Sequence, residues 1–172
     1  MMTLVLGGVR SGKSQFAENL AMASGRKVTY IATAMPVDDS MVTRIAQHRE
    51  RRPAEWGVIE APLRLARSIA GADAGDACLL IDCLSIWITN LLVAEDDAQL
   101  DDEIENLLNQ LAQISGEVIL VSSETSMGIV PLGELSRQYG DRIGLLHQRI
   151  AALSNRVILV VAGLPQVLKG EL

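Results

Sequence analysis

The segment GGVRSGKS, residues 7–14, carries residue types that can hold a phosphate chain. It fits the pattern G-x-x-x-x-G-K-S/T, with an apolar run before it and a helical pattern after it. The glycines let successive backbone N–H groups point at an anion, and the following helix adds its positive end. Lys13 would reach the β- and γ-phosphates. The predicted nucleotide-binding residues here are Gly7, Gly8, Val9, Arg10, Ser11, Gly12, Lys13 and Ser14.

Asp82 is the second candidate for phosphate chemistry. It follows the apolar run CLLI and therefore stands at the end of a predicted strand. A carboxylate is a hard oxygen ligand that suits Mg²⁺, as does the hydroxyl of Ser14. The alternative for Asp82 is a helix cap at a strand–helix turn. Because a phosphate loop is present, we predict Ser14 and Asp82 as Mg²⁺ ligands.

The segment RIAQHRERRPAEW, residues 44–56, holds one of the two histidines of the chain. A neutral imidazole can attack phosphorus and form a covalent intermediate, so His48 is the candidate nucleophile. Nearby arginines can hold phosphate oxygens, and we expect their like charge to disfavour the protonated ring. The alternative is a solvated, charged helix face with no catalytic task. The arginines are Arg44, Arg49, Arg51 and Arg52, of which the last three are predicted to bind nucleotide.

The roles of two further residues, and of the two cysteines, are interpreted from their positions and spacing along the chain. Thr33 lies just past the second predicted strand, where ligands gather in open α/β sheets, and it is predicted to bind nucleotide. His147 lies in an amphipathic helical pattern without a charged cluster around it, so we predict a structural or surface role. The two cysteines, Cys78 and Cys83, fit no metal-binding spacing and are interpreted as reduced structural thiols.

The elements that must position these residues are short apolar strands alternating with helices. Runs that are apolar throughout indicate strands covered on both faces, and the alternation indicates a mostly parallel α/β sheet with helices on both faces. One domain over residues 1–172 is the simplest organisation. The predicted strands are Thr3–Leu6, Val28–Ala32, Cys78–Ile81, Val118–Ser122 and Val157–Val161. The predicted helices are Ser14–Ala23, Met41–Glu50, Leu63–Ile69, and the patterns over 101–114 and 135–155.

The net charge and the apolar runs of the chain limit the kinds of molecule that it is expected to bind. The net charge of −6 argues against nucleic acid, which needs a basic face. The sequence contains no run of about 18 apolar residues, so no membrane-spanning helix is predicted. The opening MMTLVLGG lacks the basic region of a signal peptide, so a cytoplasmic location is expected.

Six segments occur in an order that resembles one family. They are LVLGGVRSGKS, YIATA, RIAQHRERRPAEW, LLIDCLSIWITNLL, MGIVP and VVAGLPQVLKG. Together they resemble the bifunctional adenosylcobinamide kinase/adenosylcobinamide-phosphate guanylyltransferase family of cobalamin biosynthesis. The chain departs from the family pattern at Ser123 and Ser126, which stand where the family often has asparagine and glycine. It also departs at His147, where asparagine is usual.

The resemblance implies two reactions and a RecA-like P-loop fold. A nucleoside triphosphate, ATP or GTP, would phosphorylate adenosylcobinamide with Mg²⁺ present. GTP would then transfer GMP to that phosphate through a GMP–histidine intermediate, and His48 is the residue that matches the family's histidine. The resemblance also implies that Glu60 contacts the nucleotide and that the protein is a homotrimer.

Two alternatives remain open from the sequence. The first is a small-molecule kinase without the guanylyl step, which would share Lys13, Ser14 and Asp82. The second is a nucleotide-gated regulatory module of RecA-like type. No base-reading motif distinguishes ATP from GTP as the phosphoryl donor.

Overall fold

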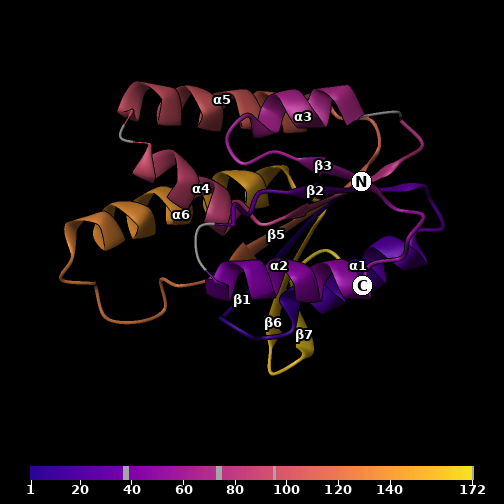
Figure 1. Ribbon diagram of the computed structural model, residues 1–172, viewed down its shortest axis with the longest axis horizontal. Helices are drawn as coiled ribbons and strands as arrows, with labels where there is room; N and C mark the ends of the chain where they lie inside the picture. Colours follow the sequence, from indigo (N-terminus) through magenta and orange to yellow (C-terminus); the bar gives the residue numbers. More distant parts are fainter. Residues whose placement is uncertain (37–38, 73–74, 95, 172) are drawn as a thin grey trace.

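The computed structural model describes residues 1–36, 39–72, 75–94 and 96–171. A seven-stranded sheet of order β3-β2-β4-β5-β1-β6-β7 forms its centre (Figure 1). All neighbouring strands are parallel except β6 and β7, which confirms the predicted mostly parallel α/β sheet. The strands are β1 Met2–Gly7, β2 Val28–Ala32, β3 Gly57–Glu60, β4 Cys78–Asp82, β5 Glu117–Ser123, β6 Arg156–Val161 and β7 Leu164–Lys169. The helices are α1 Lys13–Ala23, α2 Asp39–Arg51, α3 Leu65–Ala72, α4 Leu84–Val93, α5 Asp97–Gln113 and α6 Glu134–Leu153.

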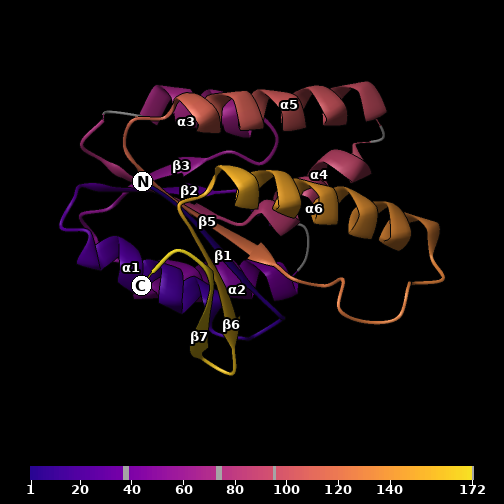
Figure 2. The same cartoon turned by 180° about the vertical axis from the view of Figure 1, so that it is seen from behind.

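Helices cover both faces of the sheet. In the two opposite views, α1 and α2 lie on one side, and α3, α4, α5 and α6 lie on the other (Figures 1 and 2). One core cluster joins the sheet to the larger helical layer through side chains such as Leu65, Trp87 and Leu107. A second joins it to α1 through Ala17 and Ala21. The central strands are therefore buried on both faces, which accounts for their uninterrupted apolar runs. Among the described residues, no helix has the length and apolar character that a membrane crossing requires.

The strand register gathers the predicted site residues at one edge of the sheet. Ala32 pairs with Asp82 across β2 and β4, and Gly7 pairs with Ser123 across β1 and β5. Because parallel strands end at the same edge, the phosphate loop after β1 and the carboxylate that ends β4 face one crevice.

The helix α4 was not predicted from the sequence. Its residues, LSIWITNLLV, are apolar on nearly all sides and rich in β-branched types, so they lack the polar face that marks a surface helix. The helix packs against β5 on one side and against α5 and α6 on the other, and Trp87 is fully buried there. The indole Nε1 of Trp87 donates to the carbonyl of Leu63 at 2.8 Å, which satisfies its one polar atom.

The strands β3 and β7 were also not predicted. Both lie at the ends of the strand order, where exposure interrupts the apolar pattern. Pro165 lies within β7, and such an edge position tolerates a residue that lacks a backbone N–H. The hairpin from β6 to β7 turns at Ala162 and Gly163, whose φ angles are 52° and 80°. Two residues of positive φ are typical of a tight two-residue hairpin.

Candidate active site

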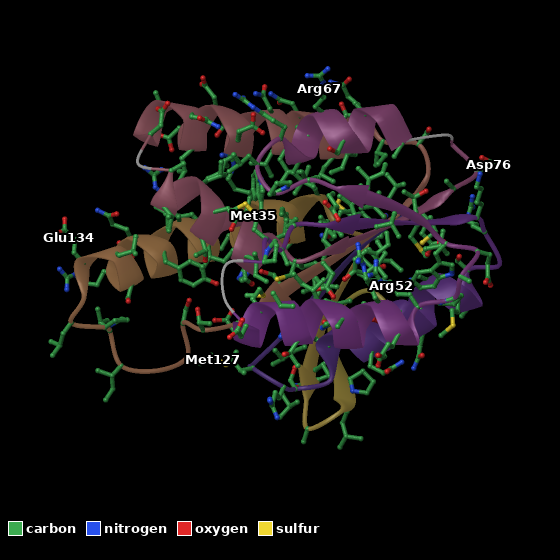
Figure 3. All side chains as sticks on the ribbon, in the orientation of Figure 1. Met35, Arg52, Arg67, Asp76, Met127 and Glu134 are labelled. Atoms are coloured by element: carbon green, nitrogen blue, oxygen red, sulfur yellow. The ribbon has the colours of Figure 1, made fainter. Side chains whose placement is uncertain are left out.

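A pocket of about 510 Å³ opens at the carboxyl edge of the sheet, beneath α2. It is bordered by the phosphate loop, the ends of β2 and β4, and one side of α2. Figure 3 shows Arg52, which directly follows α2, in the space between α2 and the sheet. The predicted site residues that border it are Val9, Lys13, Ser14, His48, Arg49, Arg52, Glu60 and Asp82.

The phosphate loop has the tight curvature that its glycines permit. Gly12 has φ 94° and caps α1, which begins at Lys13. A Cβ at Gly7 would lie 2.6 Å from the carbonyl oxygen of Val160, so a side chain cannot fit there. The Nζ of Lys13 donates to the carbonyl of Gly8 at 3.1 Å, so the ammonium lies over its own loop. Arg10 has φ 55° and is exposed.

Asp82 ends β4 and lies close to the phosphate loop residues in the pocket. Its Oδ2 accepts a hydrogen bond from the hydroxyl of Tyr30 at 3.2 Å. Burial, and then the Asp82 carboxylate, raise the pKa of Tyr30 far above its usual value, so this phenol stays a donor. Asp82 and Ser14 supply the hard oxygens that Mg²⁺ prefers. Among the described residues no group of three or more histidine, cysteine or acidic side chains gathers as a metal site. Mg²⁺ binding by Ser14 and Asp82 stays a prediction. Mg²⁺ does not require such a group, since it keeps several waters and takes only one or two carboxylates besides substrate phosphates.

His48 projects from α2 into this same pocket. Its Nδ1 lies 3.8 Å from Oε1 of Glu18 and 3.8 Å from Oδ2 of Asp82, and about a third of its side chain is exposed. The sequence argument expected arginines around the ring, whereas the structure places two carboxylates against Nδ1. Glu18 was not among the predicted site residues. The available signal was a lone glutamate, one turn beyond Ser14, on the Ala17 and Ala21 side of α1.

The arginines of the segment take different positions. The guanidinium of Arg52 stacks 4.1 Å from the ring centroid of Tyr30, and its Nε donates to the carbonyl of His48 at 3.0 Å. Arg49 pairs with Glu60 at 3.6 Å, and both side chains are largely exposed. The side chains of Arg44 and Arg51 lie outside the described part of the structure.

Thr33 lies at the carboxyl edge but turns its hydroxyl into the protein. The hydroxyl donates to the carbonyl of Cys83 at 2.8 Å and accepts from the N–H of Cys83 at 2.9 Å. Asn90 donates to the carbonyl of Thr33 at 2.9 Å and to that of Pro62 at 3.0 Å. These contacts tie the ends of β2 and β4 to α4. A nucleotide contact by Thr33 stays a prediction, and the geometry favours a supporting role.

His147 is buried on α6, away from His48. Its Nε2 lies 2.7 Å from the hydroxyl of Ser122, and its Nδ1 lies 3.6 Å from Oε2 of Glu124. Burial lowers the pKa of His147, and the Glu124 carboxylate opposes this effect. The predicted structural role agrees with this placement. The sequence around His147 holds no charged cluster, and the structure adds one charged partner from elsewhere, Glu124, which directly follows β5.

Comparisons with known proteins return matches that cover nearly the whole chain. The family model described as cobinamide kinase / cobinamide phosphate guanyltransferase matches residues 3–168. The bifunctional adenosylcobalamin biosynthesis protein CobP of Pseudomonas aeruginosa is 54% identical over 171 residues, covering 99% of each chain. The CobU proteins of Salmonella typhimurium and Escherichia coli, with the same description, are 40% and 37% identical. Each alignment covers 95% of this chain and 97% of the relative.

The fold also resembles a solved structure of a different protein. The RadB recombinase matches with a TM-score of 0.53 and 17% identity, over 92% of this chain and 73% of that chain. At this identity the likeness concerns the fold alone. It supports the predicted RecA-like arrangement of a P-loop sheet.

Proposed function

The chain belongs to the cobinamide kinase / cobinamide phosphate guanylyltransferase family, and on that premise we propose that it catalyses both reactions. Adenosylcobinamide is first phosphorylated by ATP or GTP, and GTP then gives GMP to the new phosphate through an adduct on His48. One observation carries the proposal: His48, the phosphate loop and Asp82 border a single pocket. This shared border supports a site in which the proposed nucleophile and the phosphate-binding groups act on one bound nucleotide.

The kinase step uses the phosphate loop. The hydroxyl oxygen of the substrate attacks the γ-phosphorus, its proton is released, and the nucleoside diphosphate leaves. Backbone N–H groups of residues 7–14 and the ammonium of Lys13 hold the phosphate oxygens and stabilise the charge of the transition state. Ser14 and Asp82 would hold Mg²⁺, which would neutralise phosphate charge when bound.

The guanylyl step uses His48. An imidazole nitrogen attacks the α-phosphorus of GTP, a P–N bond forms, and pyrophosphate leaves. A phosphate oxygen of the corrinoid then attacks the adduct, the P–N bond breaks, and the ring is restored. Arg49, Arg51 and Arg52 are the proposed clamps for the triphosphate, and Glu60 is the proposed acceptor for guanine or ribose donors.

The experiment is product analysis with cobinamide and GTP labelled at either the α- or the γ-phosphate. The proposal expects γ-label in cobinamide phosphate, then α-label in cobinamide-GDP together with pyrophosphate. Phosphorylation without pyrophosphate release would favour the kinase-only alternative. Slow hydrolysis that ignores cobinamide would favour the regulatory module.

We further propose that the protein is a homotrimer in the cytoplasm and that it binds no nucleic acid. An exposed apolar segment between β5 and α6 supports assembly, because such patches are typical of protein contacts. In Figure 2 this segment stands away from the rest of the molecule. Light scattering after size exclusion would return three times 18.5 kDa, and a monomer would contradict this. The exposed apolar residues of the segment are Met127, Ile129, Val130 and Leu132, and Leu135 in the first turn of α6 is also exposed.

A further inference from the structure

Glu18 is a buried carboxylate in a place where an apolar residue would be ordinary. It lies on the inward face of α1 beside Ala17 and Ala21, and its side chain is only 4% exposed. Burying a charged group has a large desolvation cost unless it is paired. The described structure places His48, which comes from a different helix, against it. The position of Glu18 therefore raises the question of what the carboxylate does for that ring.

The surroundings of His48 give the two carboxylates beside it different tasks. Asp82 accepts the hydroxyl of Tyr30 and is the proposed Mg²⁺ ligand, so its oxygens have other partners when substrate is bound. Glu18 is one helical turn below Ser14, deeper than the phosphate site. Its Oε1 is 3.8 Å from Nδ1 of His48, an ion-pair distance that shortens to a hydrogen bond with a small movement. Distances of this kind often tighten only when substrate binds.

We propose that Glu18 is the positioning residue of the guanylyl step, accepting the Nδ1–H of His48 so that Nε2 faces the α-phosphorus. This rests on the proposed role of His48 as nucleophile. A neutral imidazole carries one N–H, and a carboxylate beside Nδ1 selects the tautomer with the lone pair on Nε2. The electron pair of Nε2 forms the bond to phosphorus as pyrophosphate leaves. It returns to Nε2 when the acceptor phosphate attacks. The proton stays on Nδ1 throughout.

The negative charge of Glu18 also suits the positive charge that develops on the imidazole of His48 during the reaction. The imidazole gains positive charge as the P–N bond forms, and Glu18 is placed to stabilise it. A buried, oriented group does this better than water because it need not reorganise. The kinase step does not pass through His48, so this effect should be confined to GMP transfer.

A purely structural role makes a different prediction. If Glu18 only anchors α2 on α1, its loss would loosen that contact and displace Arg49 and Arg52 together with His48. Stability and both reactions would then fall together. The two roles are therefore separated by comparing the two half-reactions and the state of the ring.

The experiment uses Glu18→Gln, which keeps the shape, and Glu18→Ala, with Glu50→Gln as control. Glu50 is an exposed glutamate on the same helix as His48. Single-turnover labelling by GTP should be about 10²-fold slower in both Glu18 variants, which is the cost of misplacing a reacting group by a short distance. Phosphorylation of cobinamide should proceed at the wild-type rate, because that step does not pass through His48. Nitrogen NMR of nucleotide-free protein with ¹⁵N-labelled histidine should show Nδ1–H on His48 in wild type and a mixed tautomer in Glu18→Ala.

Each outcome decides one claim. Labelling at the wild-type rate with an unchanged tautomer in the Glu18 variants would overturn the positioning role and leave the nucleophile intact. A parallel loss of both half-reactions with a lower melting temperature would also overturn it, in favour of anchoring. If wild-type protein takes no label, the proposed function itself fails. If Glu18→Ala does not fold, the rates of Glu18→Gln decide.

Discussion

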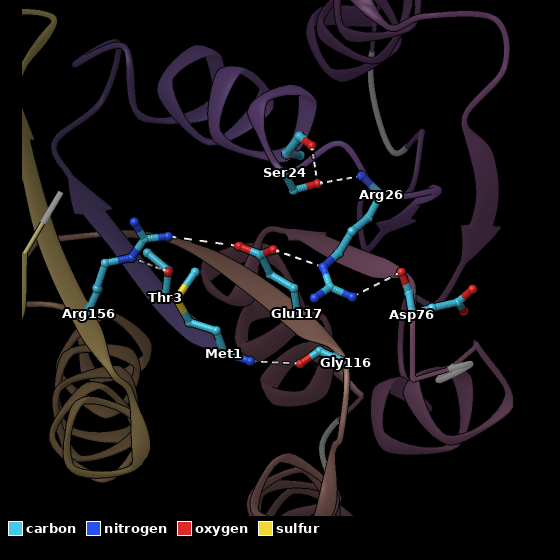
Figure 4. Close-up of polar contacts among 9 residues, drawn as sticks. Met1, Thr3, Ser24, Arg26, Asp76, Gly116, Glu117 and Arg156 are labelled. Carbon is cyan, nitrogen blue, oxygen red and sulfur yellow. Dashed lines mark hydrogen bonds and ion pairs between the residues drawn. The ribbon is translucent and has the colours of Figure 1, made fainter.

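The two edges of the sheet handle charge in opposite ways. At the amino edge, Glu117 at the start of β5 lies between two arginines, 3.5 Å from Arg26 and 3.9 Å from Arg156 (Figure 4). Arg156 also donates to the hydroxyl of Thr3 at 3.1 Å, and Arg26 donates to the carbonyl of Asp76 at 3.2 Å. These charges have partners within the protein and bind the strand beginnings together.

At the carboxyl edge the charges converge on a pocket. His48 lies 3.8 Å from each of two carboxylates, and Arg49 and Glu60 meet at 3.6 Å on an exposed surface. His48, Arg49 and Glu60 all border the pocket of the proposed site, whose volume is about 510 Å³. The two edges therefore differ: the charges at the amino edge pair with one another, and the proposed site lies at the carboxyl edge. Three substitutions and one thiol-modification experiment test this comparison.

The largest effect is expected at Lys13. Lys13→Ala removes the ammonium that would hold the β- and γ-phosphates, so we expect both half-reactions to slow by about 10³-fold. Steady-state kinetics of phosphorylation and of pyrophosphate release measure this. Lys27→Ala changes an exposed lysine at the amino edge and serves as the matched control. Similar rates in the two variants would contradict the division between edges.

Glu117→Gln should reverse that pattern. The substitution leaves Arg26 and Arg156 without their carboxylate, and we expect a loss of about 3 kcal/mol in the free energy of unfolding. The rates of both half-reactions should not change. Urea denaturation measures the loss, with Glu105→Gln as control because the exposed pair of Glu105 and Arg149 contributes little. A fall in rate without a fall in stability would show that the amino edge takes part in catalysis.

His147 should make the stability of the fold depend on pH. Burial lowers its pKa in the folded state below the ordinary value of 6.5, despite the opposing Glu124. The unfolded chain therefore binds the proton first, and the free energy of unfolding falls as pH drops below about 6.5. His147→Asn removes this titration, so part of the fall between about pH 7 and pH 5 should disappear. Denaturation at several pH values tests it. Parallel pH curves for the two proteins would show that His147 does not contribute.

The smallest effect expected is a difference in thiol reactivity between the two ends of β4. Cys78 lies at the amino end and Cys83 just past the carboxyl end, and burial raises the pKa of each thiol to about 11. At pH 8 each should react with iodoacetamide about 10²-fold more slowly than an unburied cysteine, because only the thiolate attacks. Mass spectrometry of the native protein measures both rates. Fast reaction of Cys83 alone would show that the carboxyl edge opens more readily than the amino edge.

Much of this arrangement could be predicted from local pattern. The phosphate loop and the strand end at Asp82 follow from glycine spacing and apolar runs, and parallel strands bring such ends together. Glu18 could not be found in this way, because its proposed role depends on its approach to His48 of α2, which is a tertiary contact. His147 was interpreted from its helix alone, while its partners lie 25 and 23 positions earlier: Ser122 in β5 and Glu124 directly after it.

The helix α4 and the strand β7 show the other limit of local pattern. An apolar helix buried on all sides has no amphipathic period, and an exposed edge strand has no apolar run. Both are stabilised by neighbours that the sequence does not show next to them.

The central claim is that His48 carries GMP, and covalent labelling tests it most directly. Protein mixed with α-labelled GTP and Mg²⁺ should acquire an acid-labile, base-stable label that maps to the peptide containing His48. His48→Ala should take no label and keep its fold, while His147→Asn should be labelled as wild type. A label that survives His48→Ala, or that maps to another residue, would contradict the account.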